Sequence, residues 1–107
     1  MFYFAFNPTN KLAIKMKPAI TITYCPKCHW LLRAAYMAQE LLTTFEADIQ
    51  SVTLQPSEIA GEYIIYIDGK VLFNRKVMGG FPEVKALKQL VRDVVNPEMD
   101  LGHSDKS

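Results

Sequence analysis

The stretch Ala-Ile-Thr-Ile-Thr-Tyr-Cys-Pro-Lys-Cys, residues 19–28, decides how this chain folds. Its first six residues are rich in β-branched side chains, which predicts a buried strand over 19–24. Residues 29–45 then carry apolar side chains at spacings of three and four, which predicts an amphipathic helix. A strand that delivers Cys25 and Cys28 to the start of a helix is typical of a dithiol redox site. Free N–H groups and the dipole at a helix N-terminus stabilise a thiolate, and the thiolate is the nucleophile.

The composition bounds the class of protein. The chain has 107 residues, half of them hydrophobic, and its 12 basic and 11 acidic residues leave a net charge of +1. This size suits one domain, and the charge balance lacks the basic bias of a nucleic-acid-binding protein. No stretch approaches the roughly 20 apolar residues of a membrane span. The short apolar start, residues 1–6, is a poor signal peptide. We therefore expect a cytoplasmic protein without nucleic-acid or membrane partners.

Three short segments after the first helix have the composition of β-strands. Pro56 should end the first of them, because proline cannot donate to a strand ladder. Asp68-Gly69, between the second and the third, is a strong signal for a tight hairpin turn. The expected strands are residues 49–54, 62–67 and 71–76.

A second amphipathic helix closes the pattern. Gly79-Gly80 breaks the chain before it, and Pro82 suits its first turn, where a missing N–H is harmless. Its apolar face repeats to residue 95, and Asn96-Pro97 stops it. The order β-α-β-β-β-α predicts an α/β protein with a four-stranded mixed sheet and two helices, whose first two strands run parallel. This is the plan of a small thioredoxin-like fold.

The two ends of the chain fall outside this pattern. Residues 1–17 show no clear periodicity, so we expect an N-terminal extension outside the core. Met16, just before the first strand, is a hypothetical native start. The thioredoxin-like domain is expected over residues 18–97, followed by a polar and mobile tail over 98–107.

A series of short motifs surrounds the dithiol, in a characteristic order and spacing. They are Tyr24-Cys25-Pro26-Lys27-Cys28-His29-Trp30, Arg33-Ala34, Gln39-Glu40-Leu41-Leu42, Phe45, Asp68-Gly69, Arg75-Lys76, Gly79-Gly80-Phe81-Pro82-Glu83 and Leu101-Gly102-His103-Ser104-Asp105. Together they resemble the selenoprotein W-like redox family (selenoproteins T, W and H), and within it the bacterial members that contain cysteine. The resemblance implies a thioredoxin-like fold and a thiol–disulfide oxidoreductase role in cell redox homeostasis, linked to glutathione.

Cys25 and Cys28 are the candidate catalytic residues. In thiol–disulfide exchange, one thiolate attacks an oxidised thiol or a protein disulfide, and the other resolves the mixed disulfide. A purely structural disulfide is the weaker interpretation, because the loop it would close is very short. Cys25 is expected nearer the helix start and more exposed, which favours it as the attacking group. By the resemblance, the selenocysteine of selenium-containing relatives corresponds to Cys28, so both assignments stay open.

Lys27 and His29 are candidate modulators of the thiols. The charge of Lys27 could support a thiolate, and His29 is a neighbour of the thiols that can carry a proton. Both residue types are also common as ordinary solvated groups on a protein surface. We expect no bound metal or organic cofactor, with glutathione acting as a co-substrate.

Two rival chemistries share the dithiol residues. Cys25 to His29 also match C-x-x-C-H, the attachment motif of a c-type haem. The second axial ligand would be Met37, Met78 or Met99. The preceding β-strand and the poor signal peptide argue against haem. A zinc site would need His29 and His103 beside the thiols, a spacing that does not suit four ligands.

The segment Gly79-Gly80-Phe81-Pro82 is a candidate docking loop for partners. By the resemblance it lies near the dithiol, and the alternative is that Phe81 packs in the core; Trp30 is expected in the core. Residues 63–67 offer apolar side chains to both faces of the sheet, and with two helices one face stays partly uncovered. We expect a monomer or a weak dimer. A competing function is a redox-responsive binding module, whose disulfide switches the docking surface without turnover.

Overall fold

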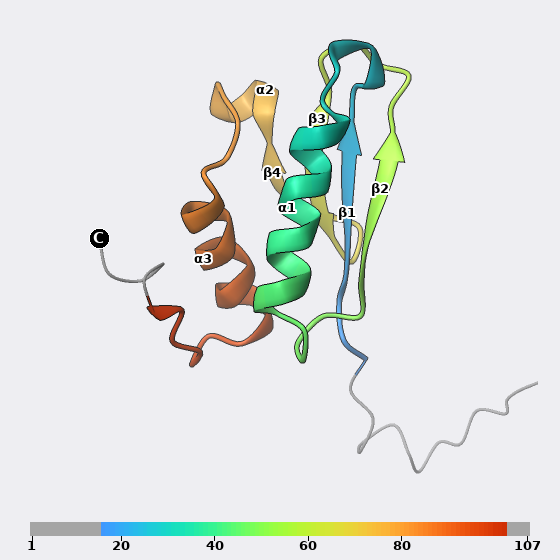
Figure 1. Ribbon diagram of the computed structural model, residues 1–107. Helices are drawn as coiled ribbons and strands as arrows, with labels where there is room; N and C mark the ends of the chain where they lie inside the picture. Colours follow the sequence, from blue (N-terminus) through green and yellow to red (C-terminus); the bar gives the residue numbers. More distant parts are fainter. Residues whose placement is uncertain (1–15, 103–107) are drawn as a thin grey trace, which may run out of the picture.

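Four strands form one mixed sheet with the first strand inside it (Figure 1). The computed structural model describes residues 16–102. β1 (Ala19–Tyr24) pairs in parallel with β2 (Ser51–Pro56) and antiparallel with β3 (Tyr63–Ile67). β4 (Lys70–Asn74) lies at the edge and pairs antiparallel with β3, so that the strand order is β2-β1-β3-β4. The predicted mixed sheet is confirmed, including the parallel pairing of its first two strands.

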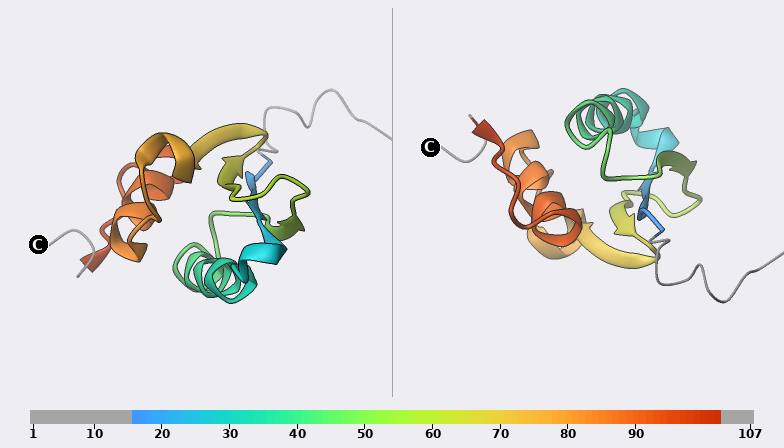
Figure 2. Two further views of the ribbon diagram at one scale, coloured as in Figure 1. Left: turned by 90° about the horizontal axis from the view of Figure 1, so that it is seen from above. Right: turned by 90° about the horizontal axis from the view of Figure 1, so that it is seen from below.

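Two main helices lie on the same face of the sheet, as the view along the strands shows (Figure 2). α1 (Leu31–Thr44) links the parallel strands β1 and β2, and α3 (Val84–Val95) follows the last strand. A short helix, α2 (Arg75–Met78), and a single 3-10 turn, η2 (Pro26–Cys28), complete the order. The architecture is that of a small thioredoxin-like protein, as the sequence predicts.

The hairpin between β3 and β4 turns where the sequence places it. Asp68 and Gly69 have φ angles of 50° and 80°, the left-handed region that a tight turn of this kind requires. The turn is also tied to the start of the central strand. The backbone N–H of Asp68 donates to the carbonyl of Ala19, and the Asp68 carboxylate accepts from the N–H of Ala19, both at 2.9 Å.

Both helix starts and several strand bounds differ from the prediction. β2 covers Ser51–Pro56 where the sequence predicts residues 49–54, so Pro56 is its last residue. α1 begins at Leu31 and not at residue 29, because His29 has a left-handed φ of 62° that a continuous right-handed helix excludes. β4 ends at Asn74, whose side chain accepts a hydrogen bond from the N–H of Lys76 and so caps the unpredicted helix α2. Pro82 lies two residues before Val84, where α3 begins, and so outside its first turn; Glu83 is the N-cap.

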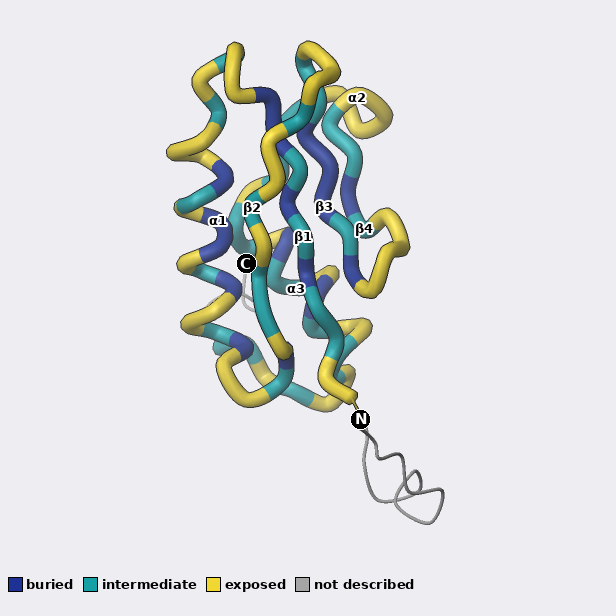
Figure 3. The backbone as a smooth tube through the Cα atoms, turned by 90° about the vertical axis from the view of Figure 1, so that its right-hand side faces the viewer, coloured by how far each residue is buried: buried dark blue, intermediate teal, exposed yellow. Residues whose placement is uncertain are grey.

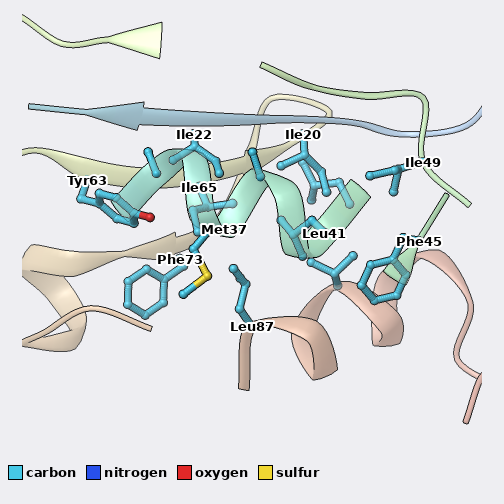
Figure 4. Packing of buried hydrophobic residues seen from close by; sticks show 14 of the residues in the cluster. Ile20, Ile22, Met37, Leu41, Phe45, Ile49, Tyr63, Ile65, Phe73 and Leu87 are labelled. Carbon is cyan, nitrogen blue, oxygen red and sulfur yellow. The ribbon is translucent and has the colours of Figure 1, made fainter. Parts of the chain in front are cut away.

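The core lies between the helices and one face of the sheet (Figure 4). β1 alternates strictly, and Ile20, Ile22 and Tyr24 are its buried residues. α1 contributes Ala34, Met37, Ala38 and Leu41 to the same layer. Leu42, expected on the apolar face of this helix, is 45% exposed instead, because it lies one position past the buried stripe of α1. Along α1 the buried parts of the backbone face the sheet and the exposed parts face away from it (Figure 3).

The C-terminal part of the described chain joins this core. Met99 and Leu101 are half-buried and pack against it, although both lie in the segment expected to be a mobile tail. The N–H of Met99 donates to the carbonyl of Asn96 at 2.9 Å, which turns the chain back after α3. The predicted extension before the first strand and the end of the tail, residues 1–15 and 103–107, lie outside the described residues.

The second face of the sheet is open among residues 16–102, because both main helices lie on the other face (Figure 2). Tyr66 alternates with the buried residues of β3 and is half-buried there, and Val71 of β4 is exposed. The predicted partly uncovered face is therefore present. No helix in this part of the chain has the length and apolar character needed to cross a lipid bilayer.

Tyr63 carries a polar atom that the core does not pair. Its side chain is 0% exposed, and its hydroxyl has no hydrogen-bond partner among the described residues. Burial raises the pKa of this phenol to about 12, and the charge of Arg33 opposes that rise. Replacing Tyr63 by Phe should therefore raise the free energy of unfolding, by about 1 kcal/mol, because an unpaired buried hydroxyl is destabilising. Urea denaturation of the two proteins measures this difference.

The matched control is Tyr66→Phe, which removes a half-exposed hydroxyl and should leave stability nearly unchanged. The advantage of Tyr63→Phe should widen as the pH rises from 10.0 to about 12. In that range the unfolded tyrosine ionises while the buried one stays neutral, so the wild type loses stability as the pH rises. A Tyr63→Phe variant less stable than the wild type would contradict an unpaired hydroxyl.

Candidate dithiol site

The dithiol lies where β1 leaves the sheet. Three backbone hydrogen bonds fix the loop there: Ser57 N–H to Tyr24 C=O at 2.7 Å, His29 N–H to Pro26 C=O at 3.0 Å and Trp30 N–H to Cys25 C=O at 3.4 Å. The loop is thus bonded to the end of β2, to itself and to the start of α1. This arrangement leaves the backbone around the two cysteines little freedom.

The N–H groups that lower the pKa of Cys25 come from its own turn and from Gly61, and not from α1. The helix expected from residue 29 begins only at Leu31, because His29 interrupts the helical path. Cys25 instead takes the N-cap position of the 3-10 turn η2 without a side-chain capping hydrogen bond, and the N–H groups of Lys27 and Cys28 contribute to the lowering. Local N–H groups therefore replace the dipole of a long helix as the source of thiolate stabilisation.

The two thiols are coupled by a hydrogen bond between their sulfur atoms. The thiol of Cys28 donates to Cys25, and this contact is the largest cause that lowers the pKa of Cys25 below the usual 9.0. The N–H of Gly61 also lowers it, while burial opposes the change. The same sulfur–sulfur bond, and then burial, raises the pKa of Cys28, partly offset by the N–H of Gly61 and less by the charge of Arg75. Cys25 is therefore the thiol of the pair that loses its proton first.

Gly61 is a site residue that the sequence analysis missed. It lies in the loop between β2 and β3 with a φ of 76°, a conformation that favours glycine. Lys76 anchors this loop, because its Nζ donates to the carbonyl of Ala60 at 3.2 Å. A glycine just before a strong strand is a signal for a special turn, but only the fold shows that this turn reaches the dithiol.

The exposure of the two cysteines is the reverse of the prediction. Cys25 is 2% exposed, whereas Cys28 is half-buried. Beside them lies a hollow of about 630 Å³, which Pro56 enters from β2 because the parallel register places it opposite Tyr24. The hollow is lined by Cys25, Pro26, Lys27, Pro56, Ser57, Glu58 and Ala60. The lowered pKa of Cys25 thus favours it as the attacking thiol, while the greater exposure of Cys28 favours Cys28.

The candidate modulators lie on the rim of the site. Lys27 is exposed and lines the hollow, and His29 is exposed at its left-handed position. His103, the second histidine of the zinc alternative, lies outside the described residues. Within residues 16–102, no three or more histidine, cysteine, aspartate or glutamate side chains are grouped so that they could hold a metal ion.

The three candidate axial ligands of the haem alternative lie in different surroundings. Met37 is buried in the core, Met78 is exposed on α2 and Met99 packs against the core after α3. A covalently attached haem also needs both cysteine sulfurs to face the porphyrin. Here Cys25 is buried and accepts a hydrogen bond from Cys28, a geometry suited to exchange between two sulfurs.

An arginine–aromatic cluster, made of Trp30, Arg33, Tyr63, Arg75 and Phe81, adjoins the dithiol. The ring of Phe81 meets those of Trp30 and Tyr63 edge to face, at centroid distances of 4.8 and 5.1 Å. The Arg33 guanidinium lies 3.9 Å from the centre of the Phe81 ring, and that of Arg75 lies 4.7 Å from the Trp30 ring. Phe81 and Trp30 are half-buried against the core, so each combines a packing position with a place beside the site.

The rest of the candidate docking loop surrounds this cluster. Gly79 has a φ of 80° and ends α2, which brings Phe81 back toward α1. Gly80 and Pro82 are half-buried, so little of the loop besides Gly79 protrudes. This geometry places Phe81 beside the dithiol. The docking role of the loop stays a prediction.

Comparison with known proteins agrees with the motifs. Residues 19–93 match the Rdx family. The chain belongs to this family. A crystal structure of a protein from Bordetella parapertussis is 56% identical to this Rdx protein, covering 72% of this chain and 96% of that chain, with a TM-score of 0.70. The selenoprotein W-related protein from Vibrio cholerae is 46% identical, covering 75% of this chain and 99% of that chain, with a TM-score of 0.72.

These similarities confirm the predicted membership among bacterial selenoprotein W-like proteins and the fold that it implies. The Rdx family is generally associated with redox chemistry, which agrees with the two neighbouring thiols. A comparison with curated proteins gave no match.

The sulfur–sulfur hydrogen bond predicts a difference between two variants. Cys28→Ala removes the donor, so the pKa of Cys25 should rise toward the usual 9.0. Cys28→Ser keeps an O–H group and should hold the pKa of Cys25 lower than alanine does. Each variant has a single thiol, so ultraviolet absorbance of the thiolate against pH reports Cys25 directly. Equal pKa values in the two variants would contradict a donor role for residue 28.

Proposed function

We propose that this Rdx-family protein is a thiol–disulfide oxidoreductase that reduces oxidised thiols or protein disulfides and uses glutathione as a co-substrate. The observation that carries the proposal is the contact between the two free thiols, which lowers the pKa of Cys25 and raises that of Cys28. Two neighbouring thiols, one of which loses its proton more easily than an ordinary cysteine, can both attack a disulfide and close on each other. Two structural thiols have no need of either property.

The exposure of the sulfurs favours Cys28 as the first attacking group. Its proton passes along the existing hydrogen bond to the Cys25 thiolate, and the Cys28 thiolate attacks one sulfur of the substrate disulfide. A bond forms between Cys28 and that sulfur, the substrate S–S bond breaks, and the other half leaves as a thiolate. Cys25 thus serves first as the general base. This order agrees with the position of selenocysteine in the selenium-containing relatives.

The second step closes the protein disulfide. Cys25 gives its proton to the departed thiolate and attacks the sulfur of Cys28, so that the Cys25–Cys28 bond forms and the second substrate half leaves. The substrate has gained two electrons, and the dithiol has lost them. Two glutathione thiols then return the protein to the dithiol state and leave as glutathione disulfide.

The geometry gives each cysteine a different expected outcome on substitution. With glutathione disulfide as the oxidant, Cys25→Ser should accumulate one glutathione on Cys28, because no thiol remains to resolve the adduct. Cys28→Ser should form much less adduct, since the remaining thiol is 2% exposed in the wild type. Turnover should fall in both to the background rate of free thiols. Intact mass after acid quenching, with peptide mapping, measures the adducts.

Two results would contradict parts of this proposal. An adduct on Cys25 in the Cys28→Ser variant, without one in Cys25→Ser, would reverse the order of attack. Wild-type turnover that is unchanged by either substitution would exclude the dithiol as the catalytic group. A wild-type protein that oxidises once, changes its affinity for a partner and does not cycle would be the redox-responsive binding module.

A further inference from the structure

Two arginines beside the dithiol have no carboxylate partner among residues 16–102. Ion pairs in this part of the chain join Lys88 to Glu40 and Arg92 to Asp93. Arg33 and Arg75 contact aromatic rings instead. Arg75 is half-buried, so its charge is less well solvated than that of a free surface arginine. An unpaired and partly desolvated cation beside a reactive group suits an anionic ligand.

Aromatic rings contact both guanidinium groups, and both groups lie near the ring of Phe81. The Phe81 ring centre lies 3.9 Å from the Arg33 guanidinium and 5.4 Å from that of Arg75. A guanidinium held over a ring keeps N–H donors along its edge, in the fork geometry that matches a carboxylate. The rings thus limit the motion of two long side chains, which lowers the entropy lost when a ligand binds.

The two arginines come from segments that adjoin the dithiol loop. Arg75 follows β4, and its charge acts on Cys28. α2 and the turn η2 lie at the same end of the sheet (Figure 1). Arg33 lies on the first turn of α1, directly after the loop, and lines a shallow hollow with His29 and Trp30. The hollow beside Cys25 has Lys27 and Glu58 on its walls, whose opposite charges give it no comparable preference.

We propose that Arg33 and Arg75 bind a carboxylate of the substrate, so that the protein selects small disulfides that carry a carboxylate near the S–S bond and directs them to Cys28. The inference rests on the proposed oxidoreductase function and adds the substrate class and its specificity-determining residues. Glutathione, the proposed co-substrate, carries two carboxylates, so its mixed disulfide with the protein has the same chemistry. Neutral and cationic disulfides lack it and should react by the same steps without the added contact.

The test compares three disulfides of similar length and different charge: dithiodipropionate, which is anionic, bis(2-hydroxyethyl) disulfide, which is neutral, and cystamine, which is cationic. The rate at which each oxidises the reduced protein is divided by its rate with dithiothreitol, which corrects for intrinsic reactivity. The wild type should prefer the anion over the neutral disulfide by about tenfold, the size of one charge-assisted contact. High salt should reduce this preference.

Arg75→Gln and Arg33→Gln should each lower the preference for the anion, measured as the ratio of the anionic to the neutral rate within the same variant. Because the charge of Arg75 also acts on Cys28, the absolute rates of Arg75→Gln are compared only through this ratio. Arg75→Lys, which keeps the charge but not the fork, should restore part of the preference. Lys70→Gln is the matched control, because it removes the same charge from the hairpin end of β4, away from the dithiol, and should change nothing.

The outcomes separate the two proposals. Equal corrected rates for all three disulfides in the wild type would overturn the carboxylate site and leave the oxidoreductase intact. An arginine variant that slows all three equally would also overturn it, because the arginine would then act only on the reactivity of Cys28. Absence of reaction with the neutral disulfide and with the other two would instead remove the proposed function itself.

Discussion

The strict alternation of β1 is the constraint on which the rest of the molecule depends. β1 pairs on both sides, and its buried residues Ile20, Ile22 and Tyr24 face the helices. A slip by one residue would turn all three toward the open face, so the register is strongly specified. The position of Cys25, one residue past the strand, is therefore fixed by core packing. The chemistry of the site begins from that fixed point.

Short-range contacts in the loop around the two cysteines then determine the reactivity of the thiols. The left-handed His29 ends the turn and keeps α1 away from the cysteines, so that the N–H groups of the turn itself face Cys25. Gly61 adds a further N–H from the other side, which the rigid loop before β3 holds in place. In the resulting dithiol, the buried Cys25 has the lower pKa and Cys28 is the more exposed sulfur. That division suits one thiol as base and resolving group and the other as the point of contact with substrate.

Local signals in the sequence predict much of this fold. The period of β1 and the turn at Asp68-Gly69 depend on neighbouring residues, and both agree with the structure. The start of α1 was predicted too early because a left-handed histidine looks like any helix-compatible residue in a sequence. Gly61 and the pairing of Arg75 with rings from other elements depend on contacts far apart along the chain. No local pattern carries that information, so the motif identified the cysteines but not the groups that tune them.

The central claim is that Cys25 and Cys28 form a reversible redox pair. The most direct test equilibrates the pure protein in glutathione buffers of graded potential, traps free thiols with an alkylating agent and reads the intact mass. We predict that the protein converts reversibly between a doubly alkylated form and an unalkylated form that lacks two hydrogens, with a transition that follows the buffer potential. Two thiols that stay fully alkylated at every potential would contradict the claim.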